Sequence, residues 1–240
     1  MIRGFYTAVA GLIANSARQA VVADNIANVS TAGFKASRTS QSAFQLELAR
    51  STGGRLGQLA TGAQSVGPFI DRTTGPAETT GVPTDLAIDG DGLFVVRTST
   101  GVAYTRAGDF AFDASGNLTT QAGEAVVGTD GKPIVVPGGA SAFTVGADGT
   151  IAGTKQRIAV VAWPQGGLRR RGGTLLTSAT APGPAVGAMV RQGSLERSNV
   201  DLATAMTELI GYQRSLSLNA RALTIQDETL GEATQLGRLH

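Results

Sequence analysis

The chain has 240 residues, enough for one or two domains with a hydrophobic core. Its 20 basic and 18 acidic residues nearly balance, which argues against a dedicated nucleic-acid-binding protein. Cysteine is absent, and the only histidine is the last residue, His240. Disulfides, thiolate metal sites, cysteine catalysis and histidine-based triads are therefore excluded.

The first predicted element is an amphipathic helix at the N-terminal end. Apolar residues recur at heptad spacing from Ile2 to Ile26, with Phe5, Val9, Leu12 and Ile26 on the expected seam. The same run resembles a secretory signal only faintly, because polar residues interrupt it and the heptad continues past the expected cleavage position. We therefore expect a retained helix, and no stretch of the chain has the length of a membrane-spanning segment.

Helix-breaking residues follow this seam directly. Asn28 and Gly33 tolerate the left-handed backbone that ends a helix, and Thr31 offers a side-chain hydrogen bond to exposed backbone groups. A simple helix cap is enough to explain this pattern by itself. A function for the segment has to come from its comparison with other sequences.

Short apolar runs alternate with glycine-containing turns through the middle of the chain. Leu86–Ile88 and Leu93–Val96 are joined by Asp-Gly-Asp-Gly at 89–92, which predicts a β-hairpin. Similar turn signals recur about every 8 to 15 residues as far as Asp148-Gly149. We predict a mainly antiparallel β domain over residues 37–195.

Several charged positions in this region could suggest chemistry, but each fits a turn better. The segment 89–92 lacks the remaining ligands of an EF-hand. Asp109 with Asp113, or Asp89 with Asp91, could form an acid–base pair, although Asp in glycine-rich turns ordinarily caps backbone groups. The basic run 169–171 is predicted to be a solvated loop tip, with contact to an acidic neighbour as the alternative. We predict no enzyme activity, no metal and no cofactor.

The last predicted element is a second long helix that continues the same spacing. Its expected seam consists of Leu202, Leu209, Tyr212, Leu216, Asn219, Leu223, Gln226 and Leu230. The pattern alone leaves open whether the terminal helices form an ordinary hairpin or a coiled coil. In the coiled-coil interpretation, Asn219 and Gln226 are the polar seam positions expected to set register.

These elements predict an α+β protein with a discontinuous helical domain. Residues 1–36 and 196–240 are expected to supply the two helices of an inner coiled-coil domain. Residues 37–195 are expected to form the outer, mainly antiparallel β domain inserted between them.

Segments near both ends resemble the signature sequences of bacterial flagellar rod and hook proteins. The N-terminal match includes Asn25, Ala27, Asn28, Thr31, Gly33, Phe34 and Lys35. The C-terminal match covers 193–201 and positions in the second helix, and includes Leu195, Ser198, Asn199, Val200 and Gln213. The middle of the chain is also similar, and the resemblance thins over 37–83 and 155–190.

The resemblance implies a structural subunit of the flagellar basal-body rod, in which both segments act as assembly motifs. The terminal helices would polymerise into the axial tube that transmits torque and conducts exported subunits. The implied partners are copies of the chain, neighbouring rod proteins, ring or hook proteins, and the flagellar type III export apparatus. The implied location is the periplasm-spanning rod, reached without a cleaved signal peptide and without membrane insertion.

The length of the chain and its compact middle favour a proximal rod subunit. Two alternatives stay open beside it. The first is a distal rod or short hook-type subunit of the same family. The second, from another class, is a polysaccharide-binding β module carried on a helical oligomer. That module would need an exposed aromatic platform, and the chain has one tryptophan, Trp163, and three tyrosines.

Overall fold

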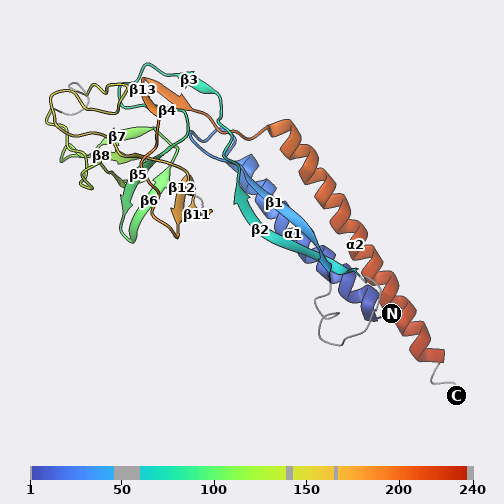
Figure 1. Ribbon diagram of the computed structural model, residues 1–240. Coiled ribbons are helices and arrows are strands. Elements are labelled where there is room, and N and C mark those ends of the chain that lie inside the picture. The colour runs from blue at the N-terminus through green and yellow to red at the C-terminus, as the bar shows by residue number, and fades with distance from the viewer. Residues whose placement is uncertain (1, 46–59, 139–142, 165–166, 237–240) are drawn as a thin grey trace. The chain divides into compact units, whose positions relative to one another are not determined.

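The computed structural model describes residues 2–45, 60–138, 143–164 and 167–236, which separate into two compact units (Figure 1). The first unit combines residues 1–26, 37–68 and 201–240. The second combines residues 27–36 and 69–200. Each unit is therefore built from segments that are far apart in the sequence.

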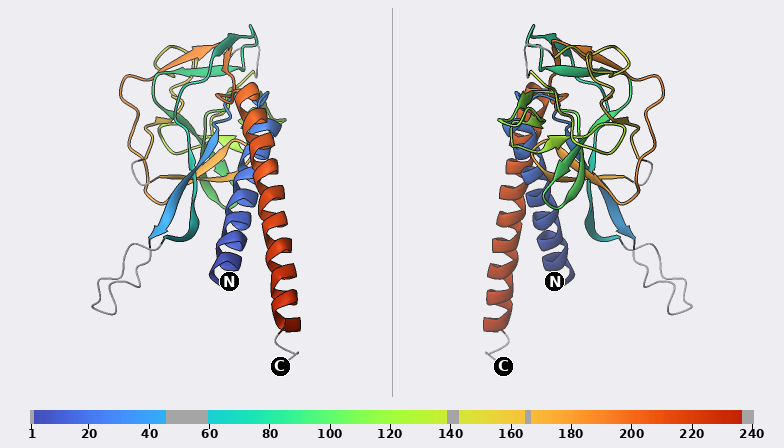
Figure 2. Two further views of the ribbon diagram at one scale, coloured as in Figure 1. Left: turned by 90° about the vertical axis from the view of Figure 1, so that its right-hand side faces the viewer. Right: turned by 90° about the vertical axis from the view of Figure 1, so that its left-hand side faces the viewer.

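Two antiparallel helices form most of the first unit. The views in Figures 1 and 2 show α1 (Ile2–Ala27) running alongside α2 (Leu202–Leu236). The Asn15 amide donates to the Ser215 hydroxyl at 2.8 Å, and the Arg18 guanidinium lies 5.8 Å from the centre of the Tyr212 ring. Within the described residues, no helix is long and apolar enough to span a membrane.

A two-stranded sheet completes the first unit. It pairs β1 (Ser37–Gln45) with β2 (Ala60–Ile70), so the segment 37–68 groups with the helices although the sequence placed it in the β-rich region. The buried Asn25 side chain connects the end of α1 to β1. Its amide donates to the Ser37 carbonyl at 2.8 Å and accepts from the Ser37 N–H at 2.9 Å.

The N-terminus of α2 is capped by Asp201, which gives a pH prediction. Its carboxylate accepts from the Ala203 and Thr204 N–H groups and from the Thr204 hydroxyl. The Thr204 side chain contributes most to holding the pKa of Asp201 below its ordinary 3.8. A carboxyl group with a lowered folded pKa stabilises above its unfolded pKa, and this stabilisation is lost as the pH falls through the folded value.

We therefore expect the helical circular dichroism of concentrated protein to fall below pH 3.8 in a step that depends on Asp201. Asp201→Asn is the matched control, because asparagine caps a helix about equally well and does not titrate. The acid step should be smaller in this variant and helicity at neutral pH unchanged. Identical acid profiles for the two proteins would contradict the assignment.

The second unit contains the remaining strands and confirms the α+β class. The strands are β3 (Ala77–Thr79), β4 (Leu86–Asp89), β5 (Leu93–Thr98), β6 (Gly101–Thr105), β7 (Phe110–Phe112), β8 (Leu118–Thr120), β9 (Ala125–Val126), β10 (Val160–Val161), β11 (Leu168–Gly172), β12 (Leu175–Ser178), β13 (Met189–Gln192) and β14 (Ser194–Glu196). The main sheet has the order β11-β12-β6-β5-β9-β8-β7, with β10 also on β5. Two further pairs, β13–β4 and β14–β3, join the C-terminal part of the unit to its beginning. All these pairs are antiparallel.

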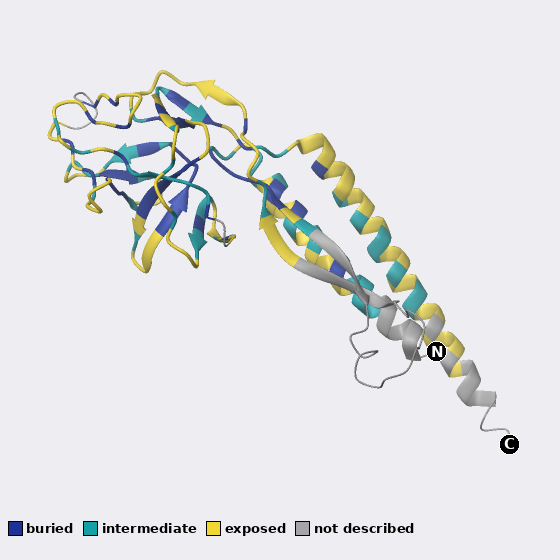
Figure 3. Ribbon diagram, in the orientation of Figure 1, coloured by how far each residue is buried: buried dark blue, intermediate teal, exposed yellow. Residues whose placement is uncertain are grey.

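Aromatic and branched aliphatic side chains from these strands form the core of the second unit. Phe94 and Phe110 meet edge to face, with ring centres 5.2 Å apart, and Phe112 meets Phe143 in the same way at 5.3 Å. Figure 3 shows the buried residues concentrated in this unit, whereas α2 is largely exposed or half-buried. Most of the interior that one chain can build by itself thus lies in the β-rich unit.

The predicted hairpin over 86–96 is wrong. Strand β4 pairs with β13, and β5 pairs with β6, β9 and β10, so the two strands are not partners. The turn between them instead surrounds a buried guanidinium. Arg106 donates to the carbonyl oxygens of Ile88, Gly90 and Gly92 at 2.8, 2.8 and 2.5 Å. These carbonyl contacts take the place of the expected ladder between β4 and β5.

Candidate assembly site at the terminal motifs

The segment that follows α1 makes a tight turn against the C-terminal motif. Thr31 bonds back to Asn28 through its N–H and its hydroxyl, which closes the turn after the helix. Gly33 then adopts φ +65° and donates its N–H to the Glu196 carbonyl at 2.7 Å. A Cβ at Gly33 would lie 2.1 Å from the Ala107 nitrogen, so only glycine fits. This turn places the next residue, Phe34, in a fully buried position.

Three charged side chains meet in the interior immediately beside this turn. We call Lys35, Arg106 and Glu196 the buried charge cluster. The Glu196 carboxylate accepts from Lys35 Nζ at 2.5 Å and from Arg106 Nε at 2.5 Å, and all three side chains are only 2–3% exposed. The Gly75 N–H donates to the same carboxylate at 2.9 Å. One carboxylate thus joins the N-terminal motif, the middle of the chain and the C-terminal motif.

The cluster contains two cations and a single carboxylate, so it has a net positive charge. Burial disfavours that charge. Burial lowers the pKa of Lys35, and the hydrogen bond and charge of Glu196 oppose that shift. Lys35 also donates to the Thr73 carbonyl at 2.7 Å. Glu196 is therefore the group that makes the two buried cations tolerable.

Asn199 provides a second connection between the two motifs. Its side-chain oxygen accepts from the Ala36 N–H at 2.7 Å, and its amide nitrogen donates to the Thr73 carbonyl and hydroxyl at 3.0 Å each. Its own N–H donates to the Phe34 carbonyl at 3.4 Å. The entering and leaving segments of the β-rich unit are thus held side by side by one amide side chain.

The prediction that residues 169–171 form a solvated loop tip is wrong, because these residues lie in strand β11. The Arg170 guanidinium stacks over the Phe34 ring, 4.1 Å from its centre, and donates to the Lys35 carbonyl and, at 2.6 Å, to the Gly173 carbonyl. Arg169 and Arg171 are exposed on the same strand. Arg170 thus covers Phe34 of the N-terminal motif, although the run of three like charges in the sequence suggested that all three arginines are solvated.

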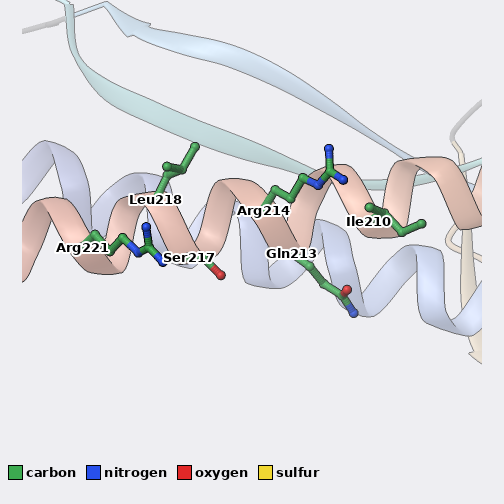
Figure 4. A pocket seen from close by; sticks show the side chains of 6 residues that line it. All are labelled: Ile210, Gln213, Arg214, Ser217, Leu218 and Arg221. Atoms are coloured by element: carbon green, nitrogen blue, oxygen red, sulfur yellow. The ribbon is translucent and has the colours of Figure 1, made fainter.

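The other predicted motif residues occupy varied positions. Ala27 is exposed at the end of α1, Leu195 is half-buried in β14, and Ser198 is buried. Val200 donates its N–H to the Ser198 hydroxyl at 3.3 Å. Gln213 lies on the exposed surface of α2, where it lines an open groove (Figure 4).

Most of the predicted seam residues whose side chains the structure describes are half-buried. Among the described side chains, the half-buried ones are Val9, Leu12, Ile26, Leu209, Tyr212, Leu216, Asn219 and Leu223, and Leu202 is exposed. Asn219 lies opposite Gly11, where an added Cβ would come within 3.3 Å of its amide nitrogen. The side chains of Phe5, Gln226 and Leu230 lie outside the described part.

Sequence reasoning missed the residues that hold the site together. Lys35 was recognised only as a match to the motif, and Arg106, Glu196 and Arg170 were not singled out as site residues. A weak signal exists, because Lys35 and Glu196 each stand beside an apolar residue within the matched segments. Nothing in the sequence, however, shows that these two charges meet.

The acidic residues considered for catalysis have other roles in the structure. Asp113 caps its own turn by accepting from the Ser115 and Asn117 N–H groups at 2.8 Å each, and Asp89 forms an exposed ion pair with Arg191 at 2.8 Å. Burial raises the pKa of Asp109. In the part of the chain that the structure describes, no three His, Cys, Asp or Glu side chains are grouped as metal ligands would be.

The tryptophan does not present the free, exposed ring face that a sugar-binding module would need. Trp163 is half-buried against the core, and the Arg72 guanidinium lies 5.7 Å from the centre of its ring. The ring face is thus engaged by a side chain of the same unit.

Comparison with known proteins matches three parts of the chain to flagellar families. Residues 5–35 match the family described as flagella basal body rod protein. Residues 87–153 match the flagellar hook protein FlgE/F/G D1 domain, and residues 191–236 match the C-terminal family of the flagellar basal body rod FlgEFG proteins. The outer two matches contain the motif residues that meet around the buried charge cluster.

Whole-chain relatives agree with these matches. The flagellar basal-body rod protein FlgG of Bacillus subtilis is 36% identical over 264 aligned residues, which cover 99% of this chain and all of the relative. FlgF proteins of Rhizobium meliloti and Escherichia coli are 33% and 34% identical, and the alignments cover 95% and 98% of this chain and 94% and 98% of the relatives. The chain therefore belongs to the family of flagellar basal-body rod proteins.

Proposed function

We propose that this protein is a structural subunit of the flagellar basal-body rod and polymerises through its terminal helices. The observation that carries the proposal is the contrast between the two units. The β-rich unit has a hydrophobic core, whereas Ala205 is the only buried residue among the described side chains of α2. A helix of 35 residues with so little burial gains most of its stability from packing against neighbours.

In this proposal the seams of α1 and α2 are the inner layer of an axial tube and pack as coiled coils. Contacts with adjacent copies would cover the apolar side chains that one chain leaves half-buried. The tube would cross the periplasm, transmit torque through its packed interfaces, and conduct exported subunits. Further contacts would be with neighbouring rod proteins and with ring or hook proteins.

The proposal also includes delivery by the flagellar type III export apparatus without cleavage of α1. A position in the proximal rod is favoured by the length of the chain and its compact middle. FlgG and FlgF relatives are similarly close in sequence, so the rod segment is to be identified by locating a tagged subunit in isolated basal bodies.

Limited proteolysis with trypsin tests the coupling between helix folding and polymerisation. In dilute monomer we expect rapid cleavage after Arg18, Arg214 and Arg221, which lie in the helices, and slow cleavage in the β-rich unit. In concentrated samples that sediment as polymers, the same three sites should become protected, and electron microscopy should show filaments or stacked rings. Equal protection of the helices and the β-rich unit from trypsin in the dilute monomer would contradict the proposal.

A further inference from the structure

Asp-Gly pairs occur four times in the β-rich unit, at 89–90, 91–92, 130–131 and 148–149. In such a pair the Asp side chain can react with the main chain, because glycine has no Cβ to hinder the approach. The glycine nitrogen attacks Asp Cγ, a C–N bond forms, and the Cγ–O bond breaks as one water molecule leaves. A second water molecule then opens the cyclic imide at the α-carbonyl. The product is isoaspartate, which has the same mass and charge as aspartate.

The pair at 148–149 is held against this reaction. The Gly149 N–H donates to the Gly146 carbonyl at 2.8 Å, so the attacking nitrogen is engaged in the turn. The Asp148 carboxylate accepts from the Thr150 N–H at 3.1 Å and from the Thr150 hydroxyl at 2.6 Å. The Thr150 side chain contributes most to holding the pKa of Asp148 below its ordinary 3.8. The carboxyl group therefore stays ionised, which disfavours the loss of water.

The pair at 130–131 has the same arrangement. The Gly131 N–H donates to the Gly128 carbonyl at 2.9 Å, and the Asp130 carboxylate accepts from the Lys132 N–H at 3.1 Å. Both reacting groups must leave a hydrogen bond before they can meet. In the folded chain this pair is therefore expected to react slowly.

The turn that joins β4 to β5 lacks these restraints. In the part of the chain that the structure describes, no backbone carbonyl accepts from the N–H of Gly90 or Gly92. Asp89 forms an ion pair with Arg191 at 2.8 Å, but the two side chains are 54% and 56% exposed, so the pair is weak. No described residue donates to the exposed Asp91 carboxylate. The reacting groups of Asp91 and Gly92 are thus free of competing hydrogen bonds.

The same turn supplies carbonyl oxygens that surround Arg106. The Gly90 and Gly92 carbonyls accept from its guanidinium at 2.8 and 2.5 Å. Isoaspartate at position 91 would add one methylene to the main chain between these two carbonyls. They could then no longer both reach a guanidinium that Glu196 holds from another side at 2.5 Å. A chemical change at the surface would therefore weaken the buried charge cluster.

We propose that the turn 89–92 is a site of slow self-modification, at which Asp91 converts to isoaspartate and the contacts of Arg106 are weakened. Asp91 is favoured because its carboxylate is free, whereas the Asp89 carboxylate is paired with Arg191. The other two Asp-Gly turns keep their aspartates while the chain is folded. The inference concerns the ageing of each folded copy and does not depend on polymerisation.

Peptide mapping of the aged full-length chain tests this proposal. After several weeks at neutral pH, trypsin releases the two aspartates of the turn in the peptide 73–97 and the two protected ones in the peptide 107–155. A carboxyl methyltransferase specific for isoaspartate then labels the peptides with a radioactive methyl group. We expect at least several-fold more label in 73–97. Equal labelling of the two peptides would overturn the assignment, and so would the absence of label from 73–97.

Ageing of the same chain in concentrated guanidinium chloride separates the effect of structure from that of sequence. Unfolding removes the hydrogen bonds that restrain the pairs at 130–131 and 148–149. The label in 107–155 should therefore rise to a level similar to that in 73–97. A preference for 73–97 that persists in the unfolded chain would contradict the proposal, because neighbouring residues and not the fold would then select the site.

Asp91→Glu and Asp89→Glu identify the residue and its effect. Glutamate keeps the charge but must close a larger ring, which is much slower. Asp91→Glu should remove most of the label from 73–97, and Asp89→Glu should leave most of it; the reverse pattern would overturn the choice of Asp91. Urea denaturation followed by Trp163 fluorescence should show a second, less stable population in the aged wild type and none in aged Asp91→Glu. A single unchanged transition in labelled wild type would overturn the link to Arg106.

Discussion

Replacing Glu196 with glutamine is expected to lower the free energy of unfolding of the β-rich unit by about 3–5 kcal/mol, because it leaves two buried cations without their counter-charge. Lys35 and Arg106 both depend on this carboxylate, at 2.5 Å each. Glutamine keeps the size of the side chain, so the loss reports charge and not a cavity. Urea denaturation followed by Trp163 fluorescence measures it, since Trp163 lies in this unit and is the only tryptophan.

Glu78→Gln is the control for this experiment. Glu78 lies on β3, which pairs with the strand that carries Glu196, and it faces Arg197 at 3.4 Å with both side chains 56% exposed. Exposed ion pairs contribute about 0–1 kcal/mol, so this variant should unfold nearly like the wild type. Equal, small losses for the two variants would show that the buried charge cluster does not stabilise the unit.

Gly33→Ala is expected to be the most damaging small substitution in the N-terminal motif, with a loss of about 2–5 kcal/mol from backbone strain and overpacking together. The positive φ of +65° disfavours any side chain. The added Cβ would also meet backbone atoms of Arg106 and Ala107, at 2.3 Å and 2.1 Å. Because backbone cannot rotate away, the turn itself must shift, and the hydrogen bond from Gly33 to the Glu196 carbonyl should weaken.

Gly81→Ala separates these two causes. Gly81 also has a positive φ, +72°, but a Cβ there would meet no atom within 4 Å. Its expected loss is therefore the strain alone, about 1–2 kcal/mol. Urea denaturation of the two variants in parallel gives the contribution of the close contact, and similar midpoints for both would argue that the Gly33 turn can relax.

Local patterns predicted the parts of the fold that depend on neighbouring residues. The heptads located both terminal helices, and the helix-breaking residues from Asn28 to Gly33 located the end of α1. Glycine-containing turns and apolar runs predicted the antiparallel strands between the helices. These features are readable because period and turn chemistry are properties of a few consecutive residues.

Strand partners and buried charges could not be predicted in the same way. An Asp-Gly turn between apolar runs ordinarily indicates a hairpin, but residues 89–92 use their carbonyl oxygens to bind Arg106. The strand β4 then pairs with β13, about a hundred positions away. The contact of Arg170 with Phe34 could not be predicted for a related reason, because the two residues lie far apart in the sequence. A single sequence contains no local signal for contacts of this range.

The distance along the chain between Lys35 and Glu196 also has a consequence for the order of folding. These residues are 161 positions apart, so their contact closes a loop that includes nearly the whole β-rich unit. The entropy of that closure is offset only when the strands between them are already arranged. The ion pair is thus expected to form late. A chain truncated before residue 196 would keep Lys35 and Arg106 without a counter-ion. Only the full-length chain is therefore expected to complete the folding of the β-rich unit.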